Sequence, residues 1–429
     1  MIKKILKKIS PNFFLKWYYY FFPLLGAFLY RFPSKKIIVI GVTGTNGKST
    51  VVELITNVLE QANFKVASIS SIRFQIGKNK WQNRLKMTMP GRLALQKFLR
   101  QAVNKKCQYA VIEITSEGIK QFRHKFINFD TAVLTNLTRE HIEAHNGFGN
   151  YRRAKGKLFK NRGLNRSIIN LDDKNADYFL KFSAKEKWIY GIKEKQFKIK
   201  TQKIVRAIDV RAMKDGISFN IEDTEFHLML LGEFNVYNAL AAISVGLSQG
   251  ISLEKIKQAI EKVSGVSGRM ELVIEKPFKV YVDYAHTPDA LENVYKTIAG
   301  DRLICVLGSC GGGRDKWKRP EFGKIAANYC SQIILTNEDP YDERPQDILK
   351  DIEEGILEYE SPSKHYQLIF NRKGAIKKAL SMAGRGDTVI ITGKGSEPWM
   401  CVANGKKIPW DDRKIVKQEM KKMNLENKQ

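Results

Sequence analysis

The sequence lacks the cysteine spacing of a disulfide-bonded or zinc-binding protein. Its five cysteines form no CxxC pair, and their positions do not match metal-ligand spacing. An odd number of cysteines at irregular positions indicates a reducing compartment such as the cytosol. Motifs typical of DNA- or RNA-binding proteins, internal repeats and low-complexity tracts are also missing. We therefore expect an ordinary globular protein with no nucleic-acid partner.

Acidic residues are few compared with basic ones. The chain has 44 Asp and Glu residues against 73 Lys and Arg residues, which gives a formal net charge of +29. Such an excess is typical of proteins that bind nucleic acids, anionic membranes or polyanionic substrates. Because the basic residues look scattered, we interpret the excess as compositional drift combined with anionic substrates.

Apolar runs long enough to span a membrane are absent as well. Residues 17–30 are apolar and aromatic, but they include Pro23 and Gly26 and are fewer than the roughly 20 that a spanning helix needs. No signal-peptide cleavage site follows. Four lysines precede this run, and lysines beside aromatic residues suit a helix in the membrane interface. Residues 1–31 are therefore expected either to contact a membrane peripherally or to pack on the first domain.

The remaining pattern predicts an α/β protein with more than one domain, because 429 residues exceed a single core. After Pro33, short β-branched apolar runs alternate with helical spacing, which is typical of a mostly parallel sheet covered by helices. In the first series we expect strands at 36–41, 109–114, 131–134 and 167–170, and helices at 49–61, 235–248 and 253–263. Residues 197–231 instead show short alternating segments that predict antiparallel strands.

A second strand–helix series begins near residue 269. Its expected strands are 279–284, 303–307, 332–336 and 388–392. We therefore predict an N-terminal segment at 1–34, a central P-loop ATPase domain at 35–268 and a Rossmann-like C-terminal domain at 269–429. A ligand site is expected in the cleft between the two domains, beyond the carboxyl ends of their strands.

The strongest motif is GVTGTNGKST at residues 41–50, between a predicted strand and a predicted helix. Its glycines allow backbone N–H groups to face phosphate oxygens at a helix N-terminus. In such a loop Lys48 reaches the β- and γ-phosphates, and the Ser49 hydroxyl ligates Mg²⁺. Val42 stands where a strict Walker A loop has glycine, so this loop is a variant. The predicted ATP-binding residues of the loop are Gly44, Thr45, Asn46, Gly47, Lys48, Ser49 and Thr50.

The spelling TGTNGKST resembles the superfamily of Mur ligases and folylpolyglutamate synthetases, and the resemblance extends from about residue 35 to 413. It is strongest to the MurE branch, which adds the third amino acid of the peptidoglycan stem peptide. The resemblance implies that ATP activates a carboxylate as an acyl phosphate, which the amine of an amino acid then attacks. It also implies ATP and two Mg²⁺ ions as cofactors, because anionic oxygens must approach one another.

Three motifs imply the metal site. YAVIEITSE at 109–117 resembles the family's E-x-S-S-H, in which Glu113 matches a Mg²⁺ ligand, and Glu117 stands in place of the histidine and receives no role. TNLTREH at 135–141 resembles TNL-x-x-DH and makes His141 a ligand of the second metal. YRRAKGKLF at 151–159 resembles a segment whose lysine, here Lys155, is carbamoylated in most Mur ligases. A carbamate would turn this cation into a metal-binding anion.

Further motifs imply the nucleotide site. LGEFNVYNA at 231–239 resembles a segment whose second asparagine, here Asn238, contacts adenine, although Asn235 could also cap a helix. GRME at 268–271 places Arg269 to meet the ATP phosphates. DYAHTPDA at 283–290 matches the MurE signature, with Asp283 and His286 on the nucleotide side. Lys48, Lys155 and Arg269 are thus the candidate catalytic residues.

The C-terminal domain contains the motifs implied for the amino-acid substrate. GSCGGGRDKWKRP at 308–320 makes Arg314 the partner of the substrate carboxylate, and GKGSE at 393–397 assigns Gly393 and Glu397 to the substrate amine. Residues 337–341 fall where the family's D-N-P-R selects diaminopimelate, with Asp339 in place of Asn and Tyr341 in place of Arg. An acidic loop without that arginine attracts a distal ammonium rather than a carboxylate. We therefore expect L-lysine or a similar dibasic amino acid to be preferred.

One departure from the resemblance concerns the acceptor. MurE-type ligases carry about 100 residues before the P-loop that bind the UDP moiety, in keeping with ordinary domain size. Here about 40 residues precede it. The acceptor is therefore expected to be a muramyl peptide, either UDP-linked or otherwise presented, in the cytoplasm or at the inner face of the membrane. Two alternatives remain: a folylpolyglutamate-type or other carboxylate–amine ligase, and a non-catalytic ATP-binding partner in a cell-wall complex.

Overall fold

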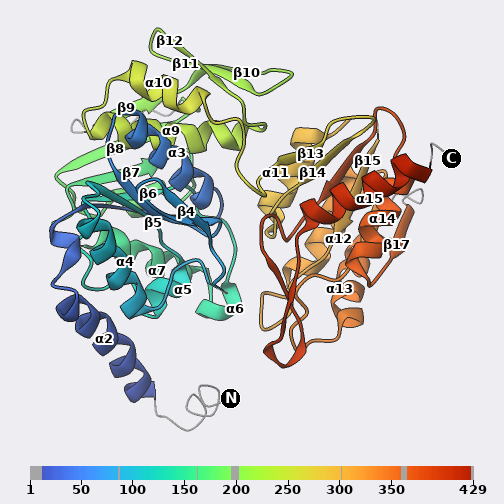
Figure 1. Cartoon of the computed structure of the whole chain (residues 1–429), viewed down its shortest axis with the longest axis horizontal. Helices are drawn as coiled ribbons and strands as arrows, with labels where there is room; N and C mark the ends of the chain where they lie inside the picture. Colours follow the sequence, from blue (N-terminus) through green and yellow to red (C-terminus); the bar gives the residue numbers. More distant parts are fainter. Residues whose placement is uncertain are drawn as a thin grey trace. The chain divides into compact units, whose positions relative to one another are not determined.

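The computed structural model describes residues 12–85, 87–161, 163–194, 202–300, 302–358 and 365–426. The chain forms two compact units, which we call unit 1 and unit 2 (Figure 1). Unit 1 is assembled from Met1–Arg139, Phe148–Met229 and Phe234–Val263, and unit 2 from Glu140–Gly147, Leu230–Glu233 and Ser264–Gln429. Each unit has its own sheet and its own hydrophobic core.

Unit 1 is built on a nine-stranded sheet with the order β4-β3-β2-β5-β1-β6-β7-β8-β9. Its strands are β1 (Ile38–Thr43), β2 (Val66–Ile69), β3 (Arg73–Ile76), β4 (Asn79–Gln82), β5 (Tyr109–Glu113), β6 (Thr131–Leu134), β7 (Arg166–Asn170), β8 (Glu186–Gly191) and β9 (Gln202–Arg206). From β2 to β9 the neighbours are parallel, whereas β3 and β4 form an antiparallel edge. The mostly parallel sheet expected from the sequence is confirmed.

Helices cover both faces of this sheet. They are α3 (Lys48–Gln61), α4 (Arg92–Asn104), α5 (Ser116–Lys120), α7 (Phe148–Phe159), α8 (Ala176–Leu180), α9 (Glu233–Ser248) and α10 (Leu253–Glu261). Figure 1 shows α3, α9 and α10 on one side of the sheet and α4, α5 and α7 on the other. Strands buried on both faces read as continuous apolar runs, which is why β1, β5 and β6 could be found from sequence.

The expectation of antiparallel strands over residues 197–231 is correct only in part. β10 (Ile208–Ala212), β11 (Ile217–Ile221) and β12 (Thr224–Leu228) form an antiparallel sheet. β9, in contrast, pairs in parallel with β8 at the edge of the main sheet, and residues 197–201 lie outside the described ranges. Alternation of exposed Ile204 with buried Val205 shows that one face of β9 meets solvent, but it does not reveal the direction of pairing.

An N-terminal helix, α2 (Asn12–Leu29), precedes the first strand and packs against α4. Gly26 permits close approach, because a Cβ there would lie 3.2 Å from Leu93 and 3.3 Å from Gln96. The 3-10 helix η1 (Pro33–Lys35) then leads into β1. Among the described residues no helix is long and apolar enough to cross a membrane. The four lysines of residues 1–8 lie outside the described ranges.

Unit 2 contains a six-stranded sheet with the order β13-β14-β18-β15-β16-β17, parallel except for β13. Its strands are β13 (Glu271–Ile274), β14 (Lys279–Val282), β15 (Leu303–Leu307), β16 (Gln332–Leu335), β17 (His365–Leu368) and β18 (Thr388–Ile391), with a separate hairpin of β19 (Trp399–Cys401) and β20 (Lys407–Pro409) around η2 (Ala403–Gly405). Its helices are α6 (Ile142–His145), α11 (Pro288–Ile298), α12 (Lys318–Tyr329), α13 (Pro345–Leu357), α14 (Arg372–Met382) and α15 (Asp412–Glu426). The α/β fold expected for this region is confirmed.

A buried ion pair fixes the two helices that cover one face of this sheet. The side chains of Arg372 in α14 and Asp412 in α15 are both completely buried. Arg372 Nε lies 3.0 Å from Oδ1 of Asp412, and Nη2 lies 2.7 Å from Oδ2. Such a two-point contact orients the partners, and loss of one partner would leave an uncompensated buried charge.

Candidate active site

The glycine-rich loop lies between β1 and α3, as its sequence predicts. β1 ends at Thr43 and α3 begins at Lys48. Gly47, the N-cap residue of α3, has φ +81°, and a Cβ at this position would lie 2.2 Å from Oδ1 of Asn238. Glycine is therefore required here for both backbone conformation and space. A loop of this kind presents backbone N–H groups at the amino end of a helix, which is the arrangement that binds phosphate.

The loop is held in place by residues that follow β6. The Thr135 hydroxyl donates to the carbonyl of Asn46 over 2.6 Å, and the Asn46 N–H donates to Oδ1 of Asn136 over 2.9 Å. Lys48 Nζ donates to the Thr45 carbonyl over 2.7 Å, so its ammonium stays beside its own loop. The carboxyl ends of β1 and β6 lie together at one sheet edge because the strands are parallel neighbours.

Glu113 meets the loop helix from the adjacent strand β5. This carboxylate is 3% exposed, and its Oε2 accepts hydrogen bonds from the Ser49 hydroxyl over 2.8 Å and from the Ser71 N–H over 2.9 Å. The Ser71 hydroxyl lies 2.7 Å from that of Ser49. Burial of an anion is costly without partners of this kind. The structure therefore brings together two of the four predicted metal ligands, Ser49 and Glu113.

These two residues suit a magnesium ion in company with a nucleotide. Within the described ranges no group of three or more His, Cys, Asp or Glu side chains is placed to hold a metal ion. Mg²⁺ does not need such a group, because it is usually bound by one or two carboxylates together with phosphate oxygens and water. A single buried carboxylate beside the hydroxyl of a phosphate-binding loop therefore fits this cation better than zinc.

Lys155 also reaches the loop. Its side chain in α7 is only 2% exposed, and Nζ donates to the carbonyl of Gly44 over 2.6 Å. The ammonium lies 4.8 Å from the ring centroid of Tyr151, whose hydroxyl is 3.0 Å from that of Thr45. Sequence alone would leave Lys155 as a helix-surface lysine. The structure instead buries it against the backbone that is predicted to bind phosphate.

His141 lies in unit 2, just before α6. The neighbouring carboxylate of Glu140 is buried and accepts a hydrogen bond from Lys318 Nζ over 3.0 Å. The carboxylate of Asp315 accepts from two backbone N–H groups at the start of α6, each over 3.0 Å. These contacts order the segment that carries His141. Because the other predicted metal ligands belong to unit 1, a metal site shared with them stays a prediction.

Asn238 is buried in α9, beside Gly47 of the loop. Its Nδ2 donates to Oδ1 of Asn235 over 2.9 Å, and both side chains are 5% exposed. α9 begins at Glu233, so Asn235 lies inside the first helical turn instead of before it. Asn235 therefore does not stand at the N-cap position of α9. Buried polar side chains are normally hydrogen-bonded, and these two asparagines satisfy each other beside the phosphate-binding loop.

The residues predicted for the nucleotide side of unit 2 come from two segments, because Asp283 and His286 follow β14 whereas Arg269 lies just before β13. Asp283 is 5% exposed, and its carboxylate accepts two backbone hydrogen bonds, from Met270 over 2.7 Å and from Ala285 over 2.6 Å. Burial raises the pKa of Asp283, although Arg269 opposes the shift. The Arg269 guanidinium lies 4.3 Å from the ring centroid of Tyr284. The Asp283 carboxylate therefore joins the segment after β14 to the backbone next to Arg269.

His286 belongs to the segment after β14. Its Nδ1 lies 2.9 Å from the carbonyl of Tyr284, and the two rings are 4.7 Å apart between centroids. Its own carbonyl accepts a hydrogen bond from Lys318 over 2.8 Å. Arg269, Asp283 and His286 are thus brought together by Tyr284 and by the backbone, within unit 2.

A buried lysine joins several of the residues predicted to bind the amino acid. Lys394 is 1% exposed, and its Nζ lies 2.9 Å from Oδ1 of Asp339 and 2.5 Å from Oε2 of Glu397. The Tyr284 hydroxyl donates to the other oxygen of Glu397 over 3.0 Å. Gly393 has φ +100°, and a Cβ there would lie 1.8 Å from Oε2 of Glu338. Asp339, Gly393 and Glu397 therefore do form one cluster, centred on Lys394.

The loop around Tyr341 is less acidic in effect than its sequence indicates. Asp339 is neutralised by Lys394, and Glu338 is 2% exposed, with a pKa that burial raises. Glu343 pairs with the buried Arg319 over 2.8 Å. Asp342, by contrast, is exposed. The acidic character expected of this loop is therefore reduced, because Glu338, Asp339 and Glu343 are paired or buried inside unit 2.

Tyr341 itself lies against the glycine turn that precedes Arg314. The Tyr341 backbone has φ +54°, and a Cβ on Gly312 would lie 2.7 Å from its ring. Arg314 is exposed on the same turn. The predicted substrate arginine and the residue in the selectivity register thus sit on two loops of unit 2 that touch at Gly312.

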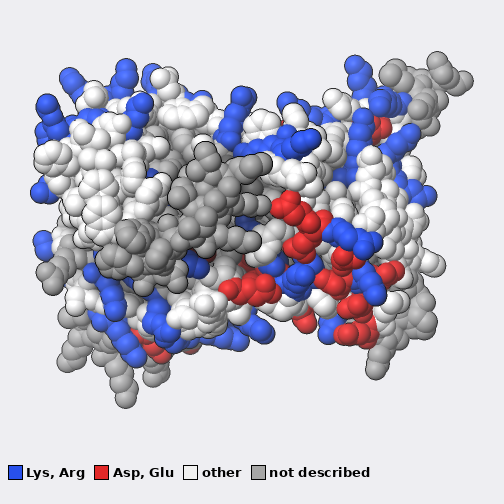
Figure 2. Space-filling view, turned by 90° about the horizontal axis from the view of Figure 1, so that it is seen from below, with Lys and Arg blue, Asp and Glu red and all other residues white. Residues whose placement is uncertain are grey.

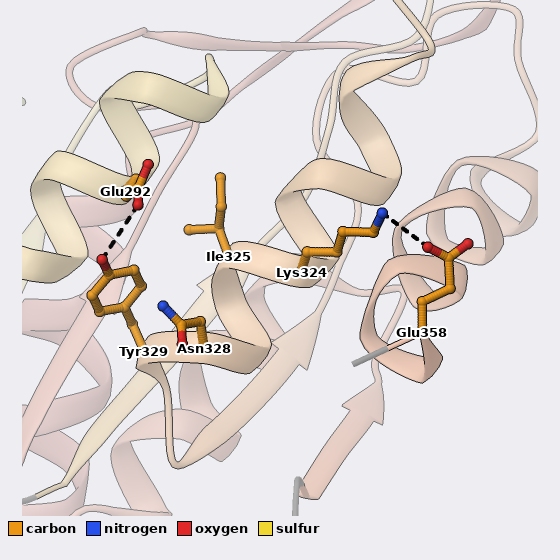
Figure 3. A pocket seen from close by; sticks show the side chains of 6 residues that line it. All are labelled: Glu292, Lys324, Ile325, Asn328, Tyr329 and Glu358. Carbon is orange, nitrogen blue, oxygen red and sulfur yellow. Dashed lines mark hydrogen bonds and ion pairs between the residues drawn. The ribbon is translucent and has the colours of Figure 1, made fainter. Parts of the chain in front are cut away.

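Unit 2 also has a surface pocket, shown in Figure 3, which is unrelated to these residues. Glu292 of α11 accepts a hydrogen bond from Tyr329 over 3.4 Å, and Lys324 of α12 lies 2.9 Å from Glu358. The lining residues are Glu292, Lys324, Ile325, Asn328, Tyr329 and Glu358. None of the residues predicted from the motifs lines it, so this pocket is not the candidate active site.

Sequence reasoning missed several residues that support the site. Lys394 is the most prominent, and the only signal for it was its place between two glycines in GKGSE. Ser71 and Tyr284 also contact predicted residues directly. Glu338 lies in the same loop as Tyr341, and its burial could not be read from the sequence. Contacts of this kind join segments that are far apart in sequence, so periodicity and spacing could not find them.

Two protein families match most of the chain. The family described as Mur ligase middle domain matches residues 42–246, which include the phosphate-binding loop, Glu113 and Lys155. The family described as Mur ligase, glutamate ligase domain matches residues 268–395, which include Arg269, Asp283 and Arg314. The helix α2 lies outside both matches.

Several curated proteins are similar over nearly the whole chain. A UDP-N-acetylmuramoyl-L-alanyl-D-glutamate--2,6-diaminopimelate ligase of Clostridium acetobutylicum is 37% identical over 412 residues, which covers 93% of this chain and 81% of the relative. A ligase with the same description from Syntrophomonas wolfei is 39% identical, covering 92% and 80%.

Solved structures are similar to this chain in fold. A structure described as this type of ligase has a TM-score of 0.61 at 30% identity and covers 90% of this chain and 79% of its own. A Mycobacterium tuberculosis folylpolyglutamate synthase has a TM-score of 0.64 at 14% identity, covering 87% and 92%, which shows a shared fold alone.

Proposed function

Because this chain belongs to the Mur ligase family, we propose that it joins an amino acid to a muramyl-peptide acceptor in peptidoglycan biosynthesis, at the expense of ATP. The observation that carries the proposal is the cluster at the phosphate-binding loop, where Glu113 contacts Ser49 and Lys155 contacts Gly44. A buried anion and a buried cation at one such loop are what a reaction between two anionic groups requires.

The proposed reaction has two steps. A carboxylate oxygen of the acceptor attacks the γ-phosphorus of ATP, which forms an acyl phosphate and releases ADP. The amine of the amino acid then attacks the acyl carbon, loses a proton and expels phosphate, which leaves an amide. Lys48 and Arg269 are the residues proposed to stabilise the charge of the phosphates in the first step.

Magnesium is the cofactor that accompanies ATP in this family. Ser49 and Glu113 are proposed to hold one ion, which supplies positive charge to the phosphate oxygens. We propose a second ion with His141 and a carbamate of Lys155 among its ligands. Carbamoylation would join the neutral amine of Lys155 to CO2 with loss of a proton, which replaces a cation by an anion that can hold a metal ion.

The amino acid is proposed to bind in unit 2. Arg314 pairs with its carboxylate, and Glu397, held by Lys394 and Tyr284, accepts the hydrogen bonds of its amine. Relatives of this chain are described as 2,6-diaminopimelate ligases, so a diamino acid is the substrate class. Tyr341 replaces an arginine that would clasp a distal carboxylate, and Asp342 is exposed beside it. These two residues support L-lysine over diaminopimelate.

The acceptor is proposed to be the muramyl dipeptide that is named for the relatives, UDP-linked or presented in another form. We place the enzyme in the cytoplasm, at the inner face of the membrane where α2 makes contact. The deciding experiment incubates the protein with ATP, Mg²⁺, UDP-linked muramyl dipeptide and either L-lysine or meso-diaminopimelate, and follows phosphate release.

Phosphate release is expected only when ATP, acceptor and amino acid are all present. Equal release without the amino acid would make the protein an ATPase and overturn the ligase proposal. Release that depends on a folate and glutamate, but not on the muramyl acceptor, would instead identify a folylpolyglutamate-type ligase. Binding of ATP without any turnover would identify a non-catalytic partner.

A further inference from the structure

The helix α2 has one face against unit 1 and another that is covered by none of the described residues. Pro23, Gly26 and Ala27 are buried against unit 1, where Gly26 approaches α4. On the other face, four large apolar side chains at positions i, i+4, i+7 and i+11 are exposed, which is one stripe of a helix. They are Trp17, 60% exposed, Phe21, 38%, Leu24, 38%, and Phe28, 71%. We call this set the aromatic stripe.

Single exposed apolar residues are ordinary, but an aligned aromatic series is a binding surface. The rings of Trp17 and Phe21 are stacked, with centroids 5.1 Å apart, so the stripe is continuous along the first half of the helix. The helix does not need these residues for its own packing, because Tyr19 and Tyr20 make the contacts to Arg92 and Phe126. Their exposure therefore points to an occupant that the described part of the chain does not supply.

Positive charge accompanies the stripe. The first 112 residues contain 20 Lys and Arg but only two acidic residues, Glu53 and Glu60, so the excess is not spread evenly along the chain. The Arg92 guanidinium lies 4.2 Å from the ring centroid of Tyr19, and Arg100 donates to the carbonyl of Tyr30 over 2.8 Å. Figure 2 shows basic side chains over unit 1, at its left, where acidic ones are few.

We infer that the aromatic stripe docks into the headgroup region of a bilayer rich in anionic phospholipids. Aromatic side chains favour this region, because their rings suit its mixed polarity. Basic residues beside them add attraction to anionic lipids. The helix lies in the surface and does not cross it, in agreement with the lack of a spanning helix among the described residues. The inference deepens the proposed function by naming the surface and the lipid class through which the ligase would reach the membrane.

A second copy of this chain is a poorer occupant. Two stripes in a symmetric dimer would bring two strongly basic regions together, and like charges across an interface are repulsive. An anionic lipid surface, in contrast, satisfies the apolar side chains and the positive charge at once. The match to the middle-domain family begins at residue 42, after this helix.

The test compares the binding of the full chain to vesicles of phosphatidylcholine alone and of phosphatidylcholine with phosphatidylglycerol. The first variant carries Trp17→Ala, Phe21→Ala and Phe28→Ala together. Its matched control removes three exposed apolar side chains of unit 2: Leu357→Ala, Leu368→Ala and Phe370→Ala, which are 66%, 38% and 44% exposed. Co-sedimentation gives the affinity, and thermal melting together with ligation of a soluble acceptor shows that each variant is folded.

The parent and the unit 2 control are expected to bind the anionic vesicles equally, more weakly as salt is added, and to bind the neutral vesicles at least tenfold less. The α2 variant is expected to lose tenfold or more in affinity for the anionic vesicles while it keeps its ligation rate. In a separate readout, Trp17→Phe keeps the binding but removes the blue shift of tryptophan fluorescence that the parent shows on anionic vesicles.

Three results would overturn the inference. The α2 variant could bind anionic vesicles as the parent does, or the parent could bind neutral vesicles equally well. The parent could also dimerise in the absence of lipid while the variant stays monomeric, which would make the stripe an interface between two copies. Failure of the proposed function is a separate outcome, because it would abolish ligation in the parent and in every variant while vesicle binding stayed intact.

Discussion

Replacement of Lys155 by alanine is expected to remove almost all ligation while leaving a folded protein. In the structure the side chain is 2% exposed, and its Nζ lies 2.6 Å from the carbonyl of Gly44. It therefore reaches the backbone that is proposed to bind the phosphates. Deletion of one preorganised electrostatic group in an enzyme typically costs about 10²–10³ in kcat, or about 3–4 kcal/mol of transition-state stabilisation. We expect a loss of at least ~10²-fold on that scale.

The assay measures phosphate release at saturating ATP and acceptor, with the magnesium concentration varied. Lys157→Ala is the matched control, because Lys157 lies two residues further along α7 and is exposed. If Lys155 acts as a carbamate, short carboxylic acids should partly restore the alanine variant by occupying the place of that anion. Thermal melting separates the loss of a buried side chain from the loss of function.

Parent-like activity of Lys155→Ala at low magnesium would remove this residue from the metal site. Loss of activity without rescue by any short acid, with the melting temperature unchanged, would retain the role of the lysine as a cation and refute the carbamate. Equal losses in Lys155→Ala and Lys157→Ala would show that the effect belongs to the helix and not to the buried ammonium.

Three further predictions concern other parts of the chain. Lys48→Ala should lower ligation at least ~10²-fold, because no other cation of the loop replaces it, and activity within threefold of the parent in phosphate release would refute the assignment. With the same acceptor, L-lysine should have a higher kcat/KM than meso-diaminopimelate. Tyr341→Arg should lower the ratio of these two kcat/KM values. A tenfold preference of the parent for diaminopimelate, about 1.4 kcal/mol, would refute the assignment of Tyr341. Burial holds the pKa of His124 at about 3, below its ordinary 6.5, so the folded protein keeps it neutral while the unfolded chain gains a proton below that ordinary value. Its contribution to stability is therefore present above pH 6.5 and lost as the pH falls towards 3. Between neutral pH and pH 5, denaturant titrations should show that the parent loses about 2 kcal/mol more unfolding free energy than His124→Gln does. Equal losses in the two proteins would refute the pKa shift.

Much of the fold could be predicted from sequence because its central strands are buried on both faces. β5, β6 and β15 are mostly apolar and are buried along their whole length, and each was located to within a residue or two. The edge strands were harder: β4 is exposed along its whole length, and β17 is exposed or half-buried. Their sequences resemble loops, and only pairing with a neighbour makes them strands.

The candidate site divides in the same way. The phosphate-binding loop could be predicted because its function depends on backbone conformation, which the glycines specify locally. The partners of Lys394 could not, because Asp339 comes from a loop 55 positions away, and burial decides that it pairs inward. The charge of the loop around Tyr341 was misjudged for this reason. A sequence gives the number of acids, whereas the fold decides which of them reach solvent.

The central claim is that a carboxylate is activated by phosphoryl transfer from ATP and then joined to an amine. It is tested most directly by an acceptor whose reacting carboxylate carries ¹⁸O at both oxygens, with the amide product and the released phosphate analysed by mass spectrometry. The account predicts one ¹⁸O atom in phosphate for each amide formed, because the acyl phosphate gives up its bridging oxygen with the leaving group. Label in AMP, or amide formation with unlabelled phosphate, would contradict it.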